Sequence, residues 1–124
     1  MELNIPKTNT TPAIRFDPAT SVLTIAGESY PENSFDFYAP VLEWLAENLP
    51  ALPGFRLDIT VSYMNSSSIK CMLDILDAIG DAHAAGKNVE VVWYYETDNP
   101  RALDLAEEFR EEVTFPFTVT AIGG

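Results

Sequence analysis

The stretch FRLDITVSYMNSSSIK, residues 55–70, decides the fold because it joins a strongly alternating segment to the start of a long amphipathic one. In its first half every second residue is apolar: Phe55, Leu57, Ile59, Val61 and Tyr63. A period of two is typical of a strand with one face on the core. The second half opens a segment with apolar residues at helical spacing, which predicts a helix over 66–85. Residues 65–68 therefore lie where a strand ends and a helix begins.

The rest of the chain continues this alternation of strands and helices. Further strands are predicted over 13–17, 21–26, 89–95 and 115–122, and further helices over 34–49 and from 98–100 to 113. The order β-β-α-β-α-β-α-β predicts one α/β domain, residues 1–124, with a mixed sheet and helices packed on it. Residues 1–11 are expected to be loosely ordered and residues 27–33 to form a polar loop. Pro40 is expected to kink its helix or to mark where the regular part begins.

Composition narrows the class of partner. The 124 residues, 47% of them hydrophobic, suit a single domain with one core. The chain carries 19 acidic and 7 basic residues, a net charge of −12. This charge opposes binding to nucleic acid or to an anionic membrane, because both are negative themselves. It favours a partner that offers a basic or apolar docking face.

The sequence argues against catalysis and against a bound metal or cofactor. Cys71 and His83 are the single cysteine and the single histidine, which excludes a Cys/His metal cluster and an internal disulfide. Glu28 and Glu32 could form an acid/base pair, but no histidine or lysine lies near them in the sequence. Neither a signal-peptide pattern nor an apolar run of about 20 residues is visible, so we expect a cytoplasmic protein.

Three consecutive hydroxyls, on Ser66, Ser67 and Ser68, lie at the predicted helix N-terminus. Such a terminus carries partial positive charge and unpaired N–H groups. A serine there can cap the helix, the turn can bind a phosphate, or a serine can itself be phosphorylated. Capping is the commonest of these uses, and it is compatible with phosphorylation of a neighbouring serine.

A family resemblance favours phosphorylation. A serine-bearing turn that opens a helix after the third strand resembles the STAS fold of the anti-sigma-factor antagonist SpoIIAA. A closer match, through most of the chain, is the SiaC family of regulatory phosphoproteins. The segments that carry it are Gly27–Ser34, Tyr63–Ser68, Lys70–Leu76, Ala106–Phe109 and Phe115–Phe117. In that family a kinase phosphorylates the hydroxyl residue that follows the asparagine, often a threonine, which implies Ser66 here. The alignment with SpoIIAA implies Ser67 instead.

The resemblance also implies partners. SiaC-like proteins are non-enzymatic switches that a kinase phosphorylates and a phosphatase dephosphorylates. In the best-known system the unphosphorylated form binds and activates a diguanylate cyclase, which implies such a partner here. This chain is expected to be a monomer or a weak dimer. The predicted partner-binding residues flank the turn on both sides: Glu28, Tyr30, Glu32, Asn33, Asn65, Ser68 and Lys70. The alternative is a small-molecule or nucleotide-binding module that uses residues 65–68 as a phosphate cradle, although the chain lacks a glycine-rich loop.

Overall fold

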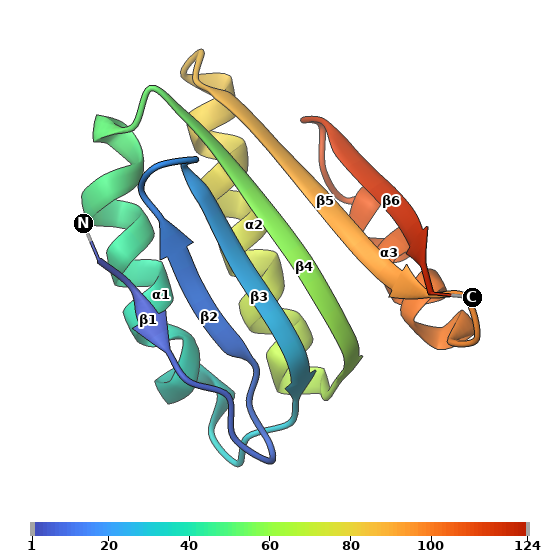
Figure 1. The fold of residues 1–124 in the computed structure, drawn as a ribbon. Helices are drawn as coiled ribbons and strands as arrows, with labels where there is room; N and C mark the ends of the chain where they lie inside the picture. The colour runs from blue at the N-terminus through green and yellow to red at the C-terminus, as the bar shows by residue number, and fades with distance from the viewer. Residues whose placement is uncertain (1, 124) are drawn as a thin grey trace.

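The computed structural model describes residues 2–123 as a six-stranded sheet with three helices on one of its faces (Figure 1). The strands are β1 (Asn4–Ile5), β2 (Ala13–Asp17), β3 (Val22–Ser29), β4 (Gly54–Met64), β5 (Asn88–Glu96) and β6 (Phe117–Ile122). The helices are α1 (Ser34–Asn48), α2 (Ser66–Ala84) and α3 (Pro100–Glu111), and a 3-10 turn, η1 (Leu49–Ala51), follows α1. Helix α1 is continuous through Pro40.

The strands lie in the sheet in the order in which they occur in the chain. The pairs β1/β2 and β2/β3 are antiparallel, and the pairs β3/β4, β4/β5 and β5/β6 are parallel. Each parallel pair is joined through one helix, and right-handed crossovers in one direction place all three helices on the same face. The predicted mixed α/β sheet is therefore confirmed.

The N-terminal segment is more ordered than the sequence suggested. Residues 4–5 form β1, which pairs with Ile14 and Arg15 of β2. Thr11 is buried, and its backbone N–H donates to the Thr8 hydroxyl at 3.1 Å. The expectation of a loose lead-in over residues 1–11 missed this strand, because a two-residue strand has no period to detect.

A register shift changes which side chains face the core near the end of β4. Gly27 pairs with Val61, but Glu28 pairs with Tyr63, so Ser62 is an extra residue in β4. The alternation therefore changes phase, Met64 is buried, and Tyr63 is half exposed. The sequence pattern had placed Tyr63 on the core face, which is wrong. Gly27 has φ +130° at this point, and a Cβ there would lie 3.2 Å from the Pro12 Cα.

The core lies between the sheet and the three helices. Its largest fully buried side chains include Trp93, Tyr38, Leu57 and Met72.

The expected loop at 27–33 is shorter than predicted, because β3 continues to Ser29. The C-terminal ends of β3 and β4 therefore lie side by side at one edge of the sheet, with Ser29 paired to Met64. Helices α1 and α2 both begin at this edge.

Candidate functional site

The turn between β4 and α2 is hydrogen-bonded to the end of β3. Ser29 pairs with Met64, and the Asn65 backbone N–H donates to the Ser29 carbonyl at 2.9 Å. The Asn65 side-chain amide also donates to the Pro31 carbonyl at 3.3 Å. Residues 28–34 and residues 65–68, more than 30 positions apart in the sequence, therefore form one site.

Asn65 caps helix α2. Its side-chain oxygen accepts from the Ser68 backbone N–H at 2.9 Å, as an N-cap residue does with the third helical residue. Capping by a serine was the simplest expectation from the sequence, and the structure assigns that role to the asparagine. The three serines are therefore the first three residues of the helix, and none of them is its cap.

A cluster of buried hydroxyls lies beneath the turn. Ser29, Ser34 and Ser68 are all almost fully buried. The Ser29 hydroxyl donates to the Ser68 oxygen at 2.8 Å, and the oxygens of Ser34 and Ser68 lie 3.1 Å apart. Buried polar groups are stable only when they have such partners, because desolvation is otherwise uncompensated. The side chain of Ser68, which was predicted to bind a partner, is therefore not accessible at the surface.

Tyr38 of α1 anchors this cluster to the core. Its hydroxyl lies 2.6 Å from the Ser29 oxygen, and its side chain is fully buried. Burial raises the pKa of Tyr38 to about 12, and the hydrogen bond to Ser29 opposes part of that rise. The phenol therefore stays neutral at physiological pH and acts as a fixed hydrogen-bonding group.

The three serines of the turn have different surroundings. Ser68 is buried, and Ser67 is half-buried with its oxygen 2.7 Å from that of Ser34. The Ser67 hydroxyl also donates to the Asn65 side-chain oxygen at 3.3 Å. Ser66, the first helical residue, is exposed. Of the three hydroxyls, that of Ser66 is therefore the most accessible to another protein.

Three aromatic side chains in the segments that meet at the turn are exposed. Tyr30 and Tyr63 are 39% and 50% exposed, and their rings pack edge to face with centroids 6.0 Å apart. The Tyr30 hydroxyl donates to the Asn9 carbonyl at 2.9 Å. Phe35, in the first turn of α1, is 56% exposed. Sequence reasoning identified Tyr30 but missed Tyr63 and Phe35, because exposure of an apolar residue at an element's end leaves no periodic signal.

The remaining predicted residues occupy different positions around the turn. Glu28, Glu32 and Lys70 are exposed, with Lys70 one helical turn beyond Ser66. Asn33 caps α1, and its side-chain oxygen accepts from the Asp36 backbone N–H at 3.1 Å. Sequence reasoning also missed the buried roles of Ser29 and Ser34. The parallel pairing of two strands that end together is the signal that could have placed Ser29 beside the turn.

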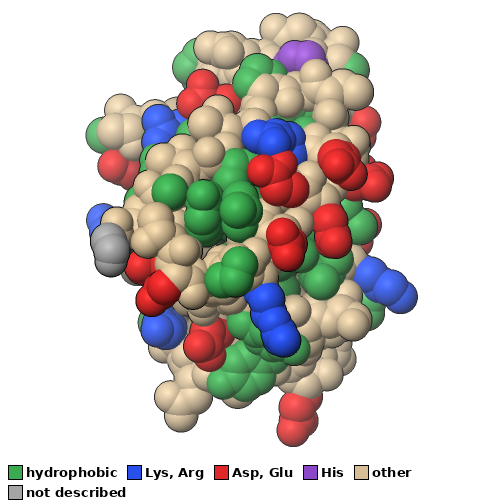
Figure 2. All heavy atoms as spheres, turned by 90° about the vertical axis from the view of Figure 1, so that its right-hand side faces the viewer, with side chains coloured by type: hydrophobic (Ala, Val, Ile, Leu, Met, Phe, Trp, Pro, Cys, Tyr) green, Lys and Arg blue, Asp and Glu red, His purple; other side chains and the backbone are tan. Residues whose placement is uncertain are grey.

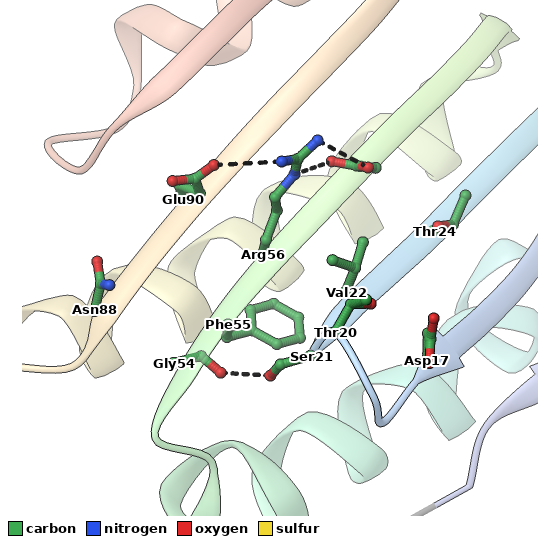
Figure 3. A pocket seen from close by; sticks show the side chains of 11 residues that line it. Asp17, Thr20, Ser21, Val22, Thr24, Gly54, Phe55, Arg56, Asn88 and Glu90 are labelled. Carbon is green, nitrogen blue, oxygen red and sulfur yellow. Dashed lines mark hydrogen bonds and ion pairs between the residues drawn. The ribbon is translucent and has the colours of Figure 1, made fainter.

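A separate polar pocket of about 670 Å³ lies on the open face of the sheet, where β4 begins (Figure 3). The Arg56 guanidinium, at one end of the pocket, is held by Asp58 at 2.6 Å and by the Tyr94 hydroxyl at 2.9 Å. These contacts satisfy the cation within the protein, and the ion pair with Asp58 raises the pKa of Arg56. The turn lies at the other end of β4, so this pocket is not part of the site.

Two general features of the described residues, 2–123, bear on the class of protein. No group of three or more His, Cys, Asp or Glu side chains is placed to hold a metal ion among them. Within the same residues, every helix is too short or too polar to cross a membrane.

The fold and the turn define a one-domain α/β protein that presents a single exposed hydroxyl at a helix N-terminus. The family model of SiaC family regulatory phosphoproteins matches residues 5–122. The chain belongs to this family.

Related proteins of known sequence or structure agree with that assignment. An uncharacterized protein of Pseudomonas aeruginosa strain UCBPP-PA14 is 43% identical over 121 residues, which cover 97% of this chain and 96% of the relative. The structure of SiaC of Pseudomonas aeruginosa has a TM-score of 0.90 at 41% identity, covering 98% of this chain and 99% of that one. A crystal structure of the diguanylate cyclase SiaD in complex with its activator SiaC, from the same organism, matches with a TM-score of 0.92 at 43% identity. That match covers 97% of this chain and 99% of the other.

Proposed function

We propose that this chain is a phosphorylation switch whose unphosphorylated form binds and activates a diguanylate cyclase. A partner kinase would phosphorylate Ser66, and a partner phosphatase would remove the phosphate. The observation that carries the proposal is the difference among the three serines, since Ser67 and Ser68 are hydrogen-bonded inward whereas Ser66 is exposed. The SiaD–SiaC complex, whose activator subunit has the same fold at 43% identity, supports the choice of partner.

The chemistry of the helix terminus suits this role. The first N–H groups of a helix lack partners within it, and they favour a nearby phosphate. A phosphate on Ser66 adds a charge of about −1.5 to −2. A partner that packs closely over Ser66 and Tyr30 would have to accommodate the volume of the phosphate. It would also have to remove water from the phosphate charge, which costs free energy. Losing about 3 kcal/mol there weakens binding more than a hundredfold, which is enough for a switch.

The proposal gives the isolated chain no catalytic role and places it in the cytoplasm, where a kinase has ATP. Membership of a family of regulatory proteins supports a non-enzymatic function. Glu28 and Glu32 then serve as surface residues beside the turn. Enzymatic turnover that follows the purified protein and disappears in Glu28→Ala or Glu32→Ala would contradict this part.

The test is activation of purified SiaD of Pseudomonas aeruginosa by four forms of this protein. These are the unmodified chain, the phosphoprotein, Ser66→Ala and Ser66→Asp, with cyclic di-GMP synthesis as the readout. We expect the unmodified chain and Ser66→Ala to activate, and the phosphoprotein to lose most of the activation. Ser66→Asp should be weakened, although the phosphoprotein decides because aspartate reproduces a phosphate poorly. Equal activation by the unmodified chain and the phosphoprotein would reject the switch at Ser66.

A further inference from the structure

A shallow groove lies beside the turn, between the end of β4, the start of α2 and α3. Its volume is about 230 Å³. Ile69 and Leu105 line it, and both also pack against the core. Tyr63 forms one wall, and three charged side chains of α3 form the other: Arg101, Asp104 and Glu108. We call this feature the α3 groove.

The size of the α3 groove favours a protein partner. Pockets for small ligands usually enclose 300–1,000 Å³ and bury most of the ligand. A volume of about 230 Å³ that is open to solvent falls below that range. Protein partners, by contrast, commonly insert one or two apolar side chains into depressions of this kind.

Tyr63 connects the α3 groove to the turn. The same side chain lines the groove and contacts Tyr30, which lies on the other side of the turn. Within residues 2–123, three large hydrophobic residues are exposed: Tyr30, Phe35 and Tyr63. Tyr30 and Phe35 lie in the segment around Ser34, and Tyr63 lies two residues before Asn65; these two segments are hydrogen-bonded to each other. Exposed aromatic residues grouped at one end of a protein mark a contact surface, because tyrosine is enriched in binding hot spots.

The charges at the rim indicate the chemistry of the partner. Asp104 and Glu108 are exposed one helical turn apart on α3, and Arg101 is the one basic residue among the described residues that line the groove. The rim therefore has a net negative charge. The whole chain has a net charge of −12. Figure 2 shows the side of the molecule on which β6 and α3 lie, with hydrophobic side chains grouped among acidic ones. A partner with Lys or Arg beside its apolar residues would be attracted and oriented by this rim.

We propose that the docking surface for the diguanylate cyclase extends from the turn across Tyr63 into the α3 groove. The groove would accept apolar side chains of the cyclase that are flanked by Lys or Arg. This inference rests on the proposed function and adds a second contact region to it. The two regions act differently, since a phosphate on Ser66 excludes the partner by volume and desolvation, whereas the rim of α3 attracts it.

The experiment compares the affinity of variants for SiaD of Pseudomonas aeruginosa by titration calorimetry at two salt concentrations. Tyr63→Ala and the double variant Asp104→Lys/Glu108→Lys test the α3 groove. The matched control is Glu43→Lys/Glu47→Lys, which reverses two exposed glutamates four residues apart on α1. This control changes the net charge by the same amount, and α1 and α3 lie at opposite ends of the helical layer (Figure 1). Circular dichroism checks that each variant is folded.

We expect Tyr63→Ala and the α3 double variant each to weaken binding at least tenfold, and the α1 control to change it less than twofold. Raising the salt concentration should narrow the gap between the parent and the α3 double variant, because salt screens the rim. One outcome is that SiaD binds the parent and both α3 groove variants with equal affinity but fails to bind the phosphoprotein. In that case the inference is wrong and the proposed function stands. If SiaD does not bind the parent, the proposed function fails and the inference fails with it.

Discussion

The hydroxyl oxygens of Ser34 and Ser67 lie 2.7 Å apart, so the first turn of α1 is hydrogen-bonded to the first turn of α2. The two helices follow different strands, and this contact fixes their N-termini relative to each other. The loop that carries Tyr30 and the turn that carries Ser66 are held by the same hydroxyl cluster. A partner therefore binds one preformed surface. The entropy of ordering these residues is lost during folding and not during binding.

The acceptor hydroxyl is the first testable point. We expect the partner kinase to add one phosphate, at Ser66, because that hydroxyl is exposed. Phosphopeptide mass spectrometry of protein co-expressed with the kinase should find it there, and Ser66→Ala should abolish it. Ser66→Thr is the matched control and should be modified. A phosphate confined to Ser67, or to distant residues such as Thr97 or Thr118, would refute this assignment.

Phosphorylation should leave the fold intact. The helix terminus favours a phosphate on Ser66 by roughly 0.3–1 kcal/mol at an exposed position, and Lys70 lies one turn away on the same face. The phosphoprotein should therefore be equal to the parent in free energy of unfolding, or slightly more stable. Urea unfolding and circular dichroism of both forms provide the measurement, and Lys70→Gln should reduce any gain. A phosphoprotein that is destabilised by more than about 1 kcal/mol would show that the switch acts by unfolding the turn.

The buried cluster should contribute to stability independently of the switch. Ser68→Ala removes the partner that both Ser29 and Ser34 contact. Ser29 keeps its contact to Tyr38 and Ser34 keeps its contact to Ser67, so two hydrogen bonds are lost but no hydroxyl is left unpaired. At about 0.5–1.5 kcal/mol for each bond, we expect a loss of roughly 1–3 kcal/mol in the free energy of unfolding. Ser66→Ala is the control and should change stability by less than about 0.5 kcal/mol, because the residue is exposed. Equal stabilities of the two variants in urea unfolding would show that the cluster is not a structural element.

Tyr38 should give the protein a specific sensitivity to high pH. Its pKa is raised to about 12 in the folded state, whereas a tyrosine in the unfolded chain ionises near the ordinary value of 10.0. As pH rises, the unfolded state loses this proton first. The contribution of Tyr38 to the free energy of unfolding is therefore complete below pH 10 and is lost as pH rises toward 12. Two pKa units correspond to roughly 3 kcal/mol.

Tyr38→Phe isolates this effect from other alkaline titrations. At pH 9 the variant should be less stable than the parent, because the Ser29 hydroxyl loses a partner. Between pH 10 and pH 12 the parent should lose stability faster, so the difference should shrink or reverse. Urea unfolding at several pH values measures it. Parallel curves for the two proteins would mean that Tyr38 ionises at the same pH in the folded and unfolded states.

Patterns within single segments could be predicted from the sequence, whereas contacts between segments could not. The alternation from Phe55 to Val61 predicted β4, and helical spacing after Ser66 predicted α2. The phase change at Tyr63 depends on a register shift against Gly27, a residue far away in the sequence. Ser34 and Ser68 meet for the same kind of reason, since their contact requires β3 and β4 to be paired first. The candidate acceptor could thus be located from the sequence, but the hydroxyls that support it could not.

The start of α2 differs from the start of α1 in its charge. Helix α1 has Asp36 in its first turn, whereas the first turn of α2 has no acidic residue and its cap, Asn65, is a neutral amide. An aspartate at position 65 would also cap the helix, but its charge would repel an incoming phosphoryl group. The amide provides the hydrogen bond and leaves the positive end of the helix without a counter-charge. Under the proposed switch, the phosphate on Ser66 would bring the first full negative charge to that helix terminus, and its removal would leave the terminus without one.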